Sequence, residues 1–230
     1  ALGFTEVITF GFMGDADSKR LRLPAEHPAY KQAIEIRNPL DKSQQYLRAV
    51  LPAGVLSVLE YNARRGMADA CLFEIAHLFL SDGDGTRETR RMSAACSGCV
   101  SSHWDGTRIE ADYFTVKGVA ESLLESLGVE GVVFEASDEP YLHPARQARI
   151  TTRKGDQIGI VGELHPDAAE EYSLRGRSGV MDFDVALLER LAASEGAMKK
   201  RILSPFPAVE RDIALIAPNE VPAAQIADVI

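Results

Sequence analysis

The stretch that decides the fold is ACLFEIAHLFL at residues 70–80, which is followed by SDGDGTRETR at 81–90 and RMSAACSGCV at 91–100. The first and last of these runs carry the apolar residues expected of strands. The residues between them, Asp82-Gly83-Asp84-Gly85-Thr86, include types that tolerate a positive φ angle in a turn. The pattern therefore predicts a long antiparallel hairpin with strands at 70–80 and 91–100.

Elements before this hairpin add a strand and a helix. The run FTEVITF at residues 4–10 is rich in β-branched and aromatic residues and predicts a strand, with a second, short strand at 34–37. Residues 14–29 show no periodicity and are predicted to form a loop. Pro52 suits the first position of a helix, and the spacing of Val55, Leu56 and Leu59 predicts that helix, ending near residues 62–66.

Elements after the hairpin complete the predicted sheet. Asp112 can accept hydrogen bonds at a helix start and Gly128 can adopt the left-handed cap, which together predict a helix between them. The other expected elements are strands at 132–135, 148–153, 157–161 and 180–185, and helices at 166–171 and 187–191. This order predicts an α+β fold, an antiparallel sheet flanked by helices, and not an alternating doubly wound domain.

A second unit is predicted to begin near Ser204. The segment Ser204-Pro205-Phe206-Pro207 is a stiff connection, and residues 213–217 then have the pattern of a new strand. A helix with apolar spacing is expected from Pro222 onward. We therefore divide the chain into residues 1–203 and an incomplete unit at 204–230, because one strand and one helix start cannot enclose a core.

The composition excludes several classes of protein. The 230 residues carry a formal net charge of −9, which is opposite in sign to the basic face that phosphate-backbone binding requires. No apolar run approaches the ~18 residues that span a bilayer, and the first residues lack the features of a signal peptide. Three cysteines cannot all pair, which argues against an oxidised exterior. We expect a cytoplasmic globular protein without a membrane partner.

Isolated groups that could carry chemistry have structural explanations as well. Cys96 and Cys99 form a lone Cys-x-x-Cys, which is two ligands short of a closed zinc site, and strand alternation would place the thiols on opposite faces. His143 and His165 each precede a proline, and a ring that satisfies backbone groups at a proline-opened turn explains them. No glycine-rich loop of the phosphate-binding kind follows a strand. These patterns predict no catalytic, cofactor-binding or metal-binding residue.

A series of short motifs in one order resembles a known family. The motifs are Asn38-Pro39-Leu40, Leu47-Arg48-x-x-Leu51-Pro52, Leu72-Phe73-Glu74-Ile75, Asp112-Tyr113-Phe114-x-x-Lys117-Gly118, Tyr141-Leu142-His143-Pro144-x-Arg146, Gly162-Glu163-Leu164-His165-Pro166 and Phe206-Pro207-Ala208-Val209-x-Arg211-Asp212. Over all 230 of its residues, the chain resembles part of the β subunit of bacterial phenylalanyl-tRNA synthetase. Motifs in a fixed order over 230 residues are far more specific than any one of them.

The resemblance implies a region of such a subunit. Residues 1–203 are similar to its class II aminoacyl-tRNA synthetase-like module, a degenerate copy of a catalytic domain, and residues from 204 onward resemble the start of its ferredoxin-like anticodon-binding domain. The family works as an (αβ)₂ assembly that attaches phenylalanine to tRNA(Phe). Its α subunit activates phenylalanine, so ATP and magnesium are implied for the whole enzyme and not for this segment.

The resemblance also implies that this segment is catalytically silent. Active class II relatives place one arginine in an Arg-x-Glu pattern, where this chain has Leu72-Phe73-Glu74, and another after a glycine-rich strand. The corresponding strand here reads Val180-Met181-Asp182-Phe183-Asp184, and its aspartates would repel a triphosphate. Loss of one such donor typically costs ~10²–10³ in rate.

A silent module is expected to serve as a surface for the α subunit. An interface of this kind commonly buries 2,000 Å² or more and is apolar at its centre. The candidate interface residues are Phe4, Val7 and Phe10 on the first strand, with Leu56 and Leu59 on the helix after Pro52. The same alternation also fits ordinary core residues, so that interpretation stays open.

Two other functions remain open at this stage. The chain could be an active class II-like ligase whose arginines align differently. It could also be a stand-alone regulatory paralogue with a binding pocket near His143, Arg146 and Glu163.

Overall fold

The computed structural model describes residues 2–83, 85–102, 104–194 and 212–218, together with residues 221, 225, 226 and 229. The chain divides into two units, Ala1–Ala197 and Met198–Ile230. The sequence-based boundary at 203/204 lies outside the described residues and stays a prediction, as does the ferredoxin-like assignment of the second unit.

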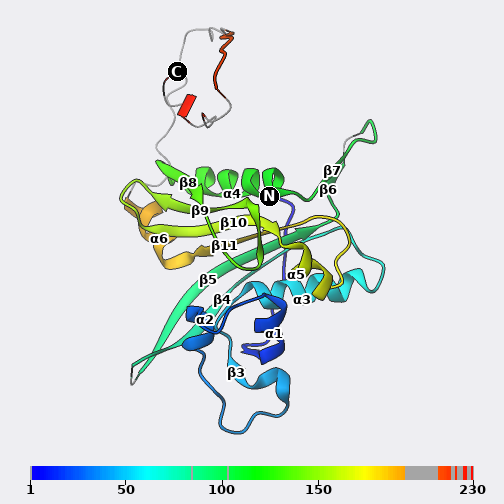
Figure 1. Ribbon diagram of the computed structural model, residues 1–230, viewed down its shortest axis with the longest axis vertical. Coiled ribbons are helices and arrows are strands. Elements are labelled where there is room, and N and C mark those ends of the chain that lie inside the picture. Colours follow the sequence, from blue (N-terminus) through cyan, green and yellow to red (C-terminus); the bar gives the residue numbers. More distant parts are fainter. Residues whose placement is uncertain are drawn as a thin grey trace. The chain divides into compact units, whose positions relative to one another are not determined.

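The first unit is built on one seven-stranded sheet (Figure 1), in which the strand order is β1-β4-β5-β11-β10-β9-β8. The strands are β1 Thr5–Glu6, β4 Ala70–Asp82, β5 Gly85–Ser97, β8 Val132–Ala136, β9 Leu142–Thr152, β10 Gln157–Leu164 and β11 Ser178–Asp184. Neighbours are antiparallel except for β1, which runs parallel to β4. The predicted α+β fold with an antiparallel sheet is confirmed.

The predicted hairpin is the longest strand pair of the unit. Its register runs without a break from Ala70 opposite Ser97 to Asp82 opposite Gly85. Gly83 has a φ of +62°, a conformation that glycine adopts without the steric cost of a Cβ atom. The strands extend further toward the turn than the sequence predicted, so that the far half of the hairpin reaches beyond the other strands (Figure 1).

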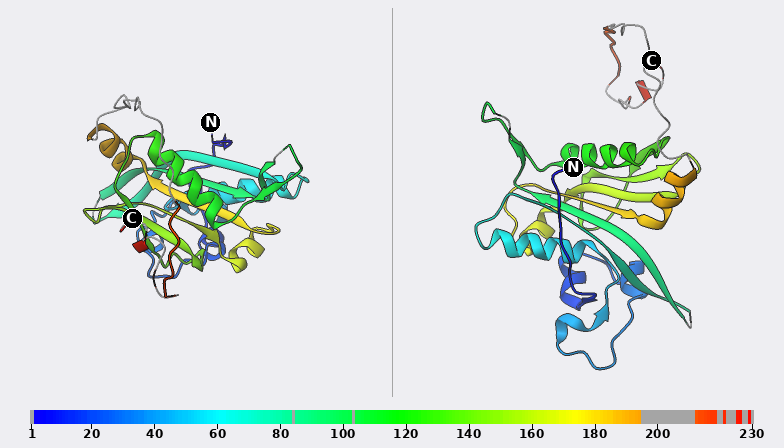
Figure 2. Two further views of the ribbon diagram at one scale, coloured as in Figure 1. Left: turned by 90° about the horizontal axis from the view of Figure 1, so that it is seen from above. Right: turned by 180° about the vertical axis from the view of Figure 1, so that it is seen from behind.

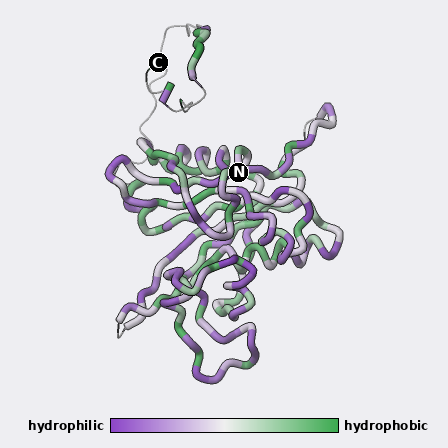
Figure 3. Tube along the Cα trace, in the orientation of Figure 1, coloured by the Kyte–Doolittle hydropathy of each residue, from purple (hydrophilic) through white to green (hydrophobic). Residues whose placement is uncertain are grey.

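Helices cover both faces of the sheet (Figure 2). One face is covered by α4 Tyr113–Ser126 and α6 Val185–Ser194, and the other by α3 Pro52–Ala63 and α5 Pro166–Glu171. Their starts and ends follow the sequence signals: Asp112 accepts a hydrogen bond from the Thr115 N–H at 2.8 Å, and Gly128 has a φ of +70°. The buried apolar residues pack where helices meet strands. Many turns consist of hydrophilic residues (Figure 3).

The N-terminal part departs from the prediction. The predicted strand at 4–10 is only Thr5–Glu6, and within residues 34–37 Glu35 makes one isolated bridge, to Tyr46, instead of a strand. The predicted loop at 14–29 contains the helix α1 Asp15–Arg20 and the start of a second helix, α2 Pro28–Lys31. Acidic residues looked like loop signals, but in α1 they lie in the first turn, where the helix dipole favours negative charge. A short 3₁₀ helix, η1 Lys42–Gln44, and a small strand pair, β2 Phe12–Met13 with β3 Tyr46–Leu47, complete this part.

Two further strands form a separate ribbon after the hairpin. β6 Cys99–Ser102 pairs with β7 Arg108–Glu110 in its own two-stranded sheet, and the ribbon projects away from the main sheet (Figure 1). Gly98, with a φ of +67°, separates β5 from β6. Cys96 and Cys99 therefore lie on different strands, and the prediction that one strand places them on opposite faces is wrong.

The second unit is described at few positions. Residues 212–218 carry no strand in the structure, so the predicted strand at 213–217 is not found. A strand needs hydrogen-bonded neighbours, and the described part of this unit supplies none to that segment. The predicted helix after Pro222 falls mainly on residues outside the described part, although residues 225 and 226 are helical.

Candidate functional site

Three polar side chains lie side by side on the sheet face that α3 covers. Glu74 of β4 is opposite Ser93 of β5, and Ser93 is opposite Asp182 of β11. All three are buried among apolar neighbours of the same face, with exposed fractions of 3%, 0% and 5%. We call these residues the polar row. Such groups are costly to bury unless they are paired, so their partners decide what the row can do.

The Glu74 carboxylate is held by two segments outside its own strand. Its Oε1 accepts hydrogen bonds from the Thr9 N–H at 3.1 Å and from Arg48 Nη1 at 2.9 Å, and its Oε2 accepts from the Thr9 hydroxyl at 2.7 Å. Arg48 itself is buried and also donates to the Thr9 hydroxyl at 2.9 Å. The charge of Glu74 is therefore balanced by a guanidinium inside the protein.

The Asp182 carboxylate has its own arginine. Arg91 Nε donates to Asp182 Oδ1 at 2.7 Å, and a second guanidinium nitrogen contacts the same oxygen. Burial raises the pKa of Asp182 in opposition to the attraction of Arg91, and the Oδ2 atom has no hydrogen-bond partner among the described residues. Arg91 also lies 3.9 Å from Asp184. Its positive charge thus faces two carboxylates.

These pairings decide what the face can do with a nucleotide. Leu72, at the position where the resemblance places an arginine in active relatives, is buried on the same face and offers no donor. Two guanidinium groups do reach the face, from Arg48 and Arg91, and sequence analysis missed both. Because each is neutralised by a buried carboxylate, the row has no excess positive charge for a triphosphate. The residues present do not fit ATP with magnesium.

The predicted interface residues fall into two groups. Leu56 and Leu59 are 0% and 1% exposed and pack in the core between α3 and the sheet, so their prediction as interface residues is wrong. Phe4 and Val7 are half-buried, whereas Phe10 is 81% exposed. Ile8, which sequence analysis did not single out, is 91% exposed.

The anchored Thr9 explains why its two neighbours are exposed. Its side chain points inward to Glu74, and it lies so close to α3 that a Cβ atom on Gly54 would be 2.5 Å from the Thr9 hydroxyl. In extended chain, successive side chains point to opposite sides. The inward Thr9 therefore turns Ile8 and Phe10 outward. The signal for this exposure in the sequence was a polar residue, Thr9, between two apolar residues.

The two histidines before prolines have backbone roles. His165 Nδ1 accepts a hydrogen bond from the Asp167 N–H at 3.2 Å and caps α5, as predicted. His143 Nδ1 accepts from the Ala145 N–H at 3.1 Å, at the beginning of β9. Arg146 and Glu163 are brought together, with 2.9 Å between Nε and Oε2. Neither cavity described below is lined by His143, Arg146 or Glu163.

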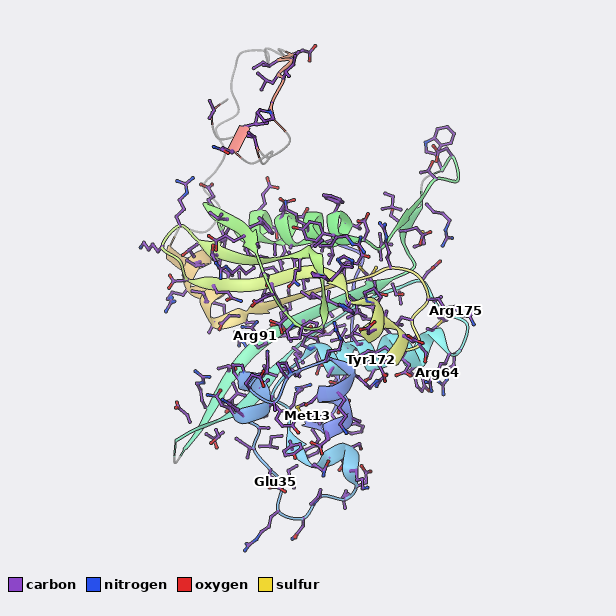
Figure 4. The ribbon with its side chains drawn as sticks, viewed as in Figure 1. Met13, Glu35, Arg64, Arg91, Tyr172 and Arg175 are labelled. Atoms are coloured by element: carbon purple, nitrogen blue, oxygen red, sulfur yellow. The ribbon has the colours of Figure 1, made fainter. Side chains whose placement is uncertain are left out.

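Two cavities are lined by described residues. The larger, about 940 Å³, is open to solvent between the end of α3 and the turn after α5, and Arg64 and Arg175 lie at its rim (Figure 4). The Arg64 guanidinium contacts Glu60 at 2.5 Å and Ser173 Oγ at 3.2 Å. The smaller cavity, about 190 Å³, is lined mostly by apolar side chains, with Cys71 and Cys96 facing each other across β4 and β5.

The described part of the chain carries neither a metal-ligand cluster nor a helix that could span a membrane. There, no three side chains among histidine, cysteine, aspartate and glutamate gather as metal ligands would. None of the described helices has the length and apolar character needed to cross a bilayer.

Comparisons with known proteins agree with the resemblance. The family model described as "Phenylalanyl tRNA synthetase beta chain CLM domain" matches residues 1–185. The phenylalanine–tRNA ligase beta subunits of Moorella thermoacetica and Carboxydothermus hydrogenoformans are 35% and 34% identical to the chain over all of it. The chain spans only 28% and 29% of the length of these two relatives.

Solved structures extend the comparison to the fold. Two structures of the pyrrolysyl-tRNA synthetase of Desulfitobacterium hafniense superpose with TM-scores of 0.60 and 0.61 at 15% and 14% identity. They cover 84% and 87% of this chain, and 64% and 68% of their own chains are matched. At this identity the likeness shows the fold alone, which is the predicted class II aminoacyl-tRNA synthetase-like fold. The match over residues 1–185 shows that the chain belongs to the phenylalanyl-tRNA synthetase beta chain CLM domain family.

Proposed function

We propose that this chain is the catalytically silent, class II-like module of a phenylalanine–tRNA ligase β subunit, and that it pairs with the catalytic α subunit. In this proposal the whole enzyme is a cytoplasmic (αβ)₂ assembly that attaches phenylalanine to tRNA(Phe). The α subunit binds ATP and magnesium and activates the amino acid. The relatives are named as beta subunits of this ligase, and the chain spans about 28% of their length, so it corresponds to one region of such a subunit.

The polar row is the observation that carries the silent role. Activation of an amino acid builds up negative charge around the α-phosphate of ATP, so a class II site needs arginines that are free to bind it. On this face Arg48 and Arg91 are bound to Glu74 and Asp182, and both carboxylates are almost fully buried. A triphosphate would have to displace these pairs and then lie beside the two acidic groups, which supports a module without ATP chemistry.

The exposed N-terminal segment supports the pairing role. Ile8 and Phe10 are 91% and 81% exposed, and both flank the anchored Thr9. Large exposed apolar side chains beside an anchored residue are typical of the centre of a protein interface. We call Ile8 and Phe10 the N-terminal patch, and we place the α subunit on it.

The experiment measures activity and association separately. The chain, the α subunit and their mixture are each assayed for phenylalanine-dependent exchange of pyrophosphate into ATP, and their masses are measured by sedimentation. We expect no exchange by the chain alone and a stable complex in the mixture. Exchange by the chain in the absence of α would overturn the silent role, and two unmixed species would overturn the pairing role.

A matched pair of variants tests the position of the interface. Phe10→Asp places a charge in the N-terminal patch, whereas Leu40→Asp places the same charge on a loop residue outside the patch that is 88% exposed. We expect Phe10→Asp to weaken association with α by about 30-fold or more, as a disrupted interface centre does. Leu40→Asp should bind like the unchanged chain.

A further inference from the structure

A projecting ribbon carries the chain's single tryptophan at its tip. Trp104 lies in the turn between β6 and β7, and its side chain is 99% exposed. The chain has one tryptophan in 230 residues. Figure 4 shows the ribbon extending away from the body of the first unit. Tryptophan is the residue type most enriched at the energetic centres of protein interfaces, so full exposure at a projecting tip calls for an explanation.

The base of this ribbon is fixed to the main sheet. Asp69, just before β4, accepts hydrogen bonds from the Cys99 N–H at 2.9 Å and from Arg108 Nη2 at 2.8 Å, which joins both strands of the ribbon to one side chain. The Ala111 N–H donates to the Gly98 carbonyl at 2.7 Å. A Cβ atom on Gly98 would lie 2.2 Å from Asp69 Oδ1, so only glycine permits this close approach.

The tip is also held in a defined turn. Asp105 Oδ1 accepts a hydrogen bond from the Thr107 N–H at 2.9 Å, and Gly106 has a φ of +86°. A two-stranded ribbon is marginal by itself, but here the base and the tip each have their own hydrogen bonds. We call residues 99–102 and 104–110 the Trp104 arm. The hydrogen bonds that hold these residues before binding lower the entropy cost of contact with a partner.

The charges of the arm indicate a protein partner. Asp105 and Glu110 are acidic, and the guanidinium of Arg108 is bound by Asp69 and Glu110. Stacking on single-stranded nucleic acid requires a basic groove along the backbone, and an anionic membrane attracts basic segments. The arm offers neither, whereas an apolar socket in a protein suits an indole with little charge around it.

The apolar surface of the arm continues into the N-terminal segment. Val100 and Ile109 of the arm line the small cavity together with Leu2 and Phe4. Phe4 precedes β1, the edge strand that leads directly to Ile8 and Phe10. The arm and the N-terminal segment therefore line one apolar cavity, which favours one partner for both surfaces.

We propose that the Trp104 arm contacts the α subunit and inserts the Trp104 indole into an apolar socket of that chain. The proposal rests on the proposed function, because it takes the same partner. The N-terminal patch and the arm are two separate anchors of one interface. Since truncation of an anchor residue typically costs far more than truncation of its neighbours, the arm should contribute strongly to affinity.

The single tryptophan makes the test direct. The 230-residue chain is prepared with 5-fluorotryptophan, so that its ¹⁹F NMR spectrum contains one resonance, from Trp104. We expect a shift typical of a water-exposed indole in the free chain. Addition of unlabelled α subunit should move and broaden this resonance and should protect the indole from a soluble paramagnetic quencher.

Variants measure the energetic role of the arm. We expect Trp104→Ala to weaken binding to α by about 30-fold or more, the loss typical of a central aromatic anchor, and Trp104→Phe to lose less. Leu40→Ala, which truncates another exposed apolar side chain, is the matched control and should leave affinity unchanged. Thermal unfolding of Trp104→Ala should match that of the unchanged chain, because a fully exposed side chain adds little to folding.

The outcomes separate this inference from the proposed function. If α binds and Phe10→Asp disrupts the complex while Trp104→Ala and the ¹⁹F resonance report no change, the pairing role stands and the arm contact is wrong. If α does not bind at all, both are wrong. A resonance that moves with the concentration of the chain alone, or with tRNA and not with α, would identify a different occupant and overturn the arm contact.

Discussion

The two faces of the seven-stranded sheet are both covered by helices, yet they are built from different side chains. The face under α4 and α6 presents Ala94, Met181, Phe183 and Ile150, all buried and apolar. The face under α3 buries the polar row among similar apolar neighbours. The first face also buries one carboxylate, Glu163, which is 4% exposed and lies near Arg146 and Arg177. The second face buries two carboxylates in one row with Ser93, so the comparison teaches that this face keeps more charged groups than packing requires.

The largest effect is expected where one partner of a buried ion pair is removed. Arg48→Met leaves the Glu74 carboxylate without its charge partner while Thr9 still holds it in the protein. We expect the free energy of unfolding to fall by about 3–5 kcal/mol, because an uncompensated buried charge is left. Urea unfolding followed by circular dichroism measures this loss.

A double variant distinguishes a buried charge from lost packing. Arg48→Met combined with Glu74→Gln removes both charges and keeps a side-chain oxygen that can accept a hydrogen bond from Thr9. We expect it to regain most of the stability, since replacing both members of a buried pair is often close to neutral. If the double variant is as unstable as Arg48→Met alone, the loss of stability comes from altered packing and not from an unpaired buried charge. The comparison between the two faces then fails.

The face under α4 should respond in a simpler way. Leu124, on α4, is 1% exposed, whereas Leu127 at the end of the same helix is 38% exposed. We expect Leu124→Ala to lower the free energy of unfolding by about 2–5 kcal/mol and Leu127→Ala by less than about 1 kcal/mol. Equal losses in urea unfolding would show that α4 does not form the core of that face.

The smallest expected effect concerns pH at the cap of α5, which packs on the face with the polar row. Burial, with a smaller contribution from Arg22, lowers the pKa of His165 from its ordinary 6.5. As the pH falls below this value, the unfolded chain takes up the proton first. This contribution to stability is therefore present above about pH 6.5 and is lost as the pH falls through the lowered pKa of the folded state.

His165→Asn isolates that titration, because asparagine can still cap the helix but does not take up a proton near neutral pH. We expect the unchanged chain to lose more stability than His165→Asn between about pH 7.5 and about pH 5. Urea unfolding at the two pH values measures the difference. A loss of the same size in both proteins would assign the pH dependence to other groups.

Elements that depend on interactions between residues close in the sequence were predicted correctly, whereas those that depend on tertiary contacts were not. The β4–β5 hairpin, α3 and α4 were predicted from local signals, namely a turn, a first-position proline and a cap. The helix α1 was missed because Asp15 and Asp17 favour both loops and first helical turns, and only tertiary contacts distinguish the two.

The site was less predictable than the fold. Leu72 and Asp182 were identified from the sequence as positions without a catalytic arginine, and the structure places both on one sheet face. The guanidinium groups that neutralise this face come from positions 26 and 91 residues away from their carboxylate partners. No local pattern encodes such pairs, because only the tertiary fold brings them together. The exposure of Phe10 and the burial of Leu56 depend equally on which helix covers which face.

The uninterrupted register of the β4–β5 hairpin also has a consequence for how the chain reaches its native state. Its strands join across a short turn, and such hairpins form in about 1–10 μs. The next partner of β5 is β11, where Ser97 and Ser178 meet from 81 residues apart. Closing a chain segment of that length lowers the conformational entropy before any stabilising contact can form. We therefore expect the hairpin to form early in folding, with one edge of β5 still unpaired. The pairing of β11 with that edge is then the slow step.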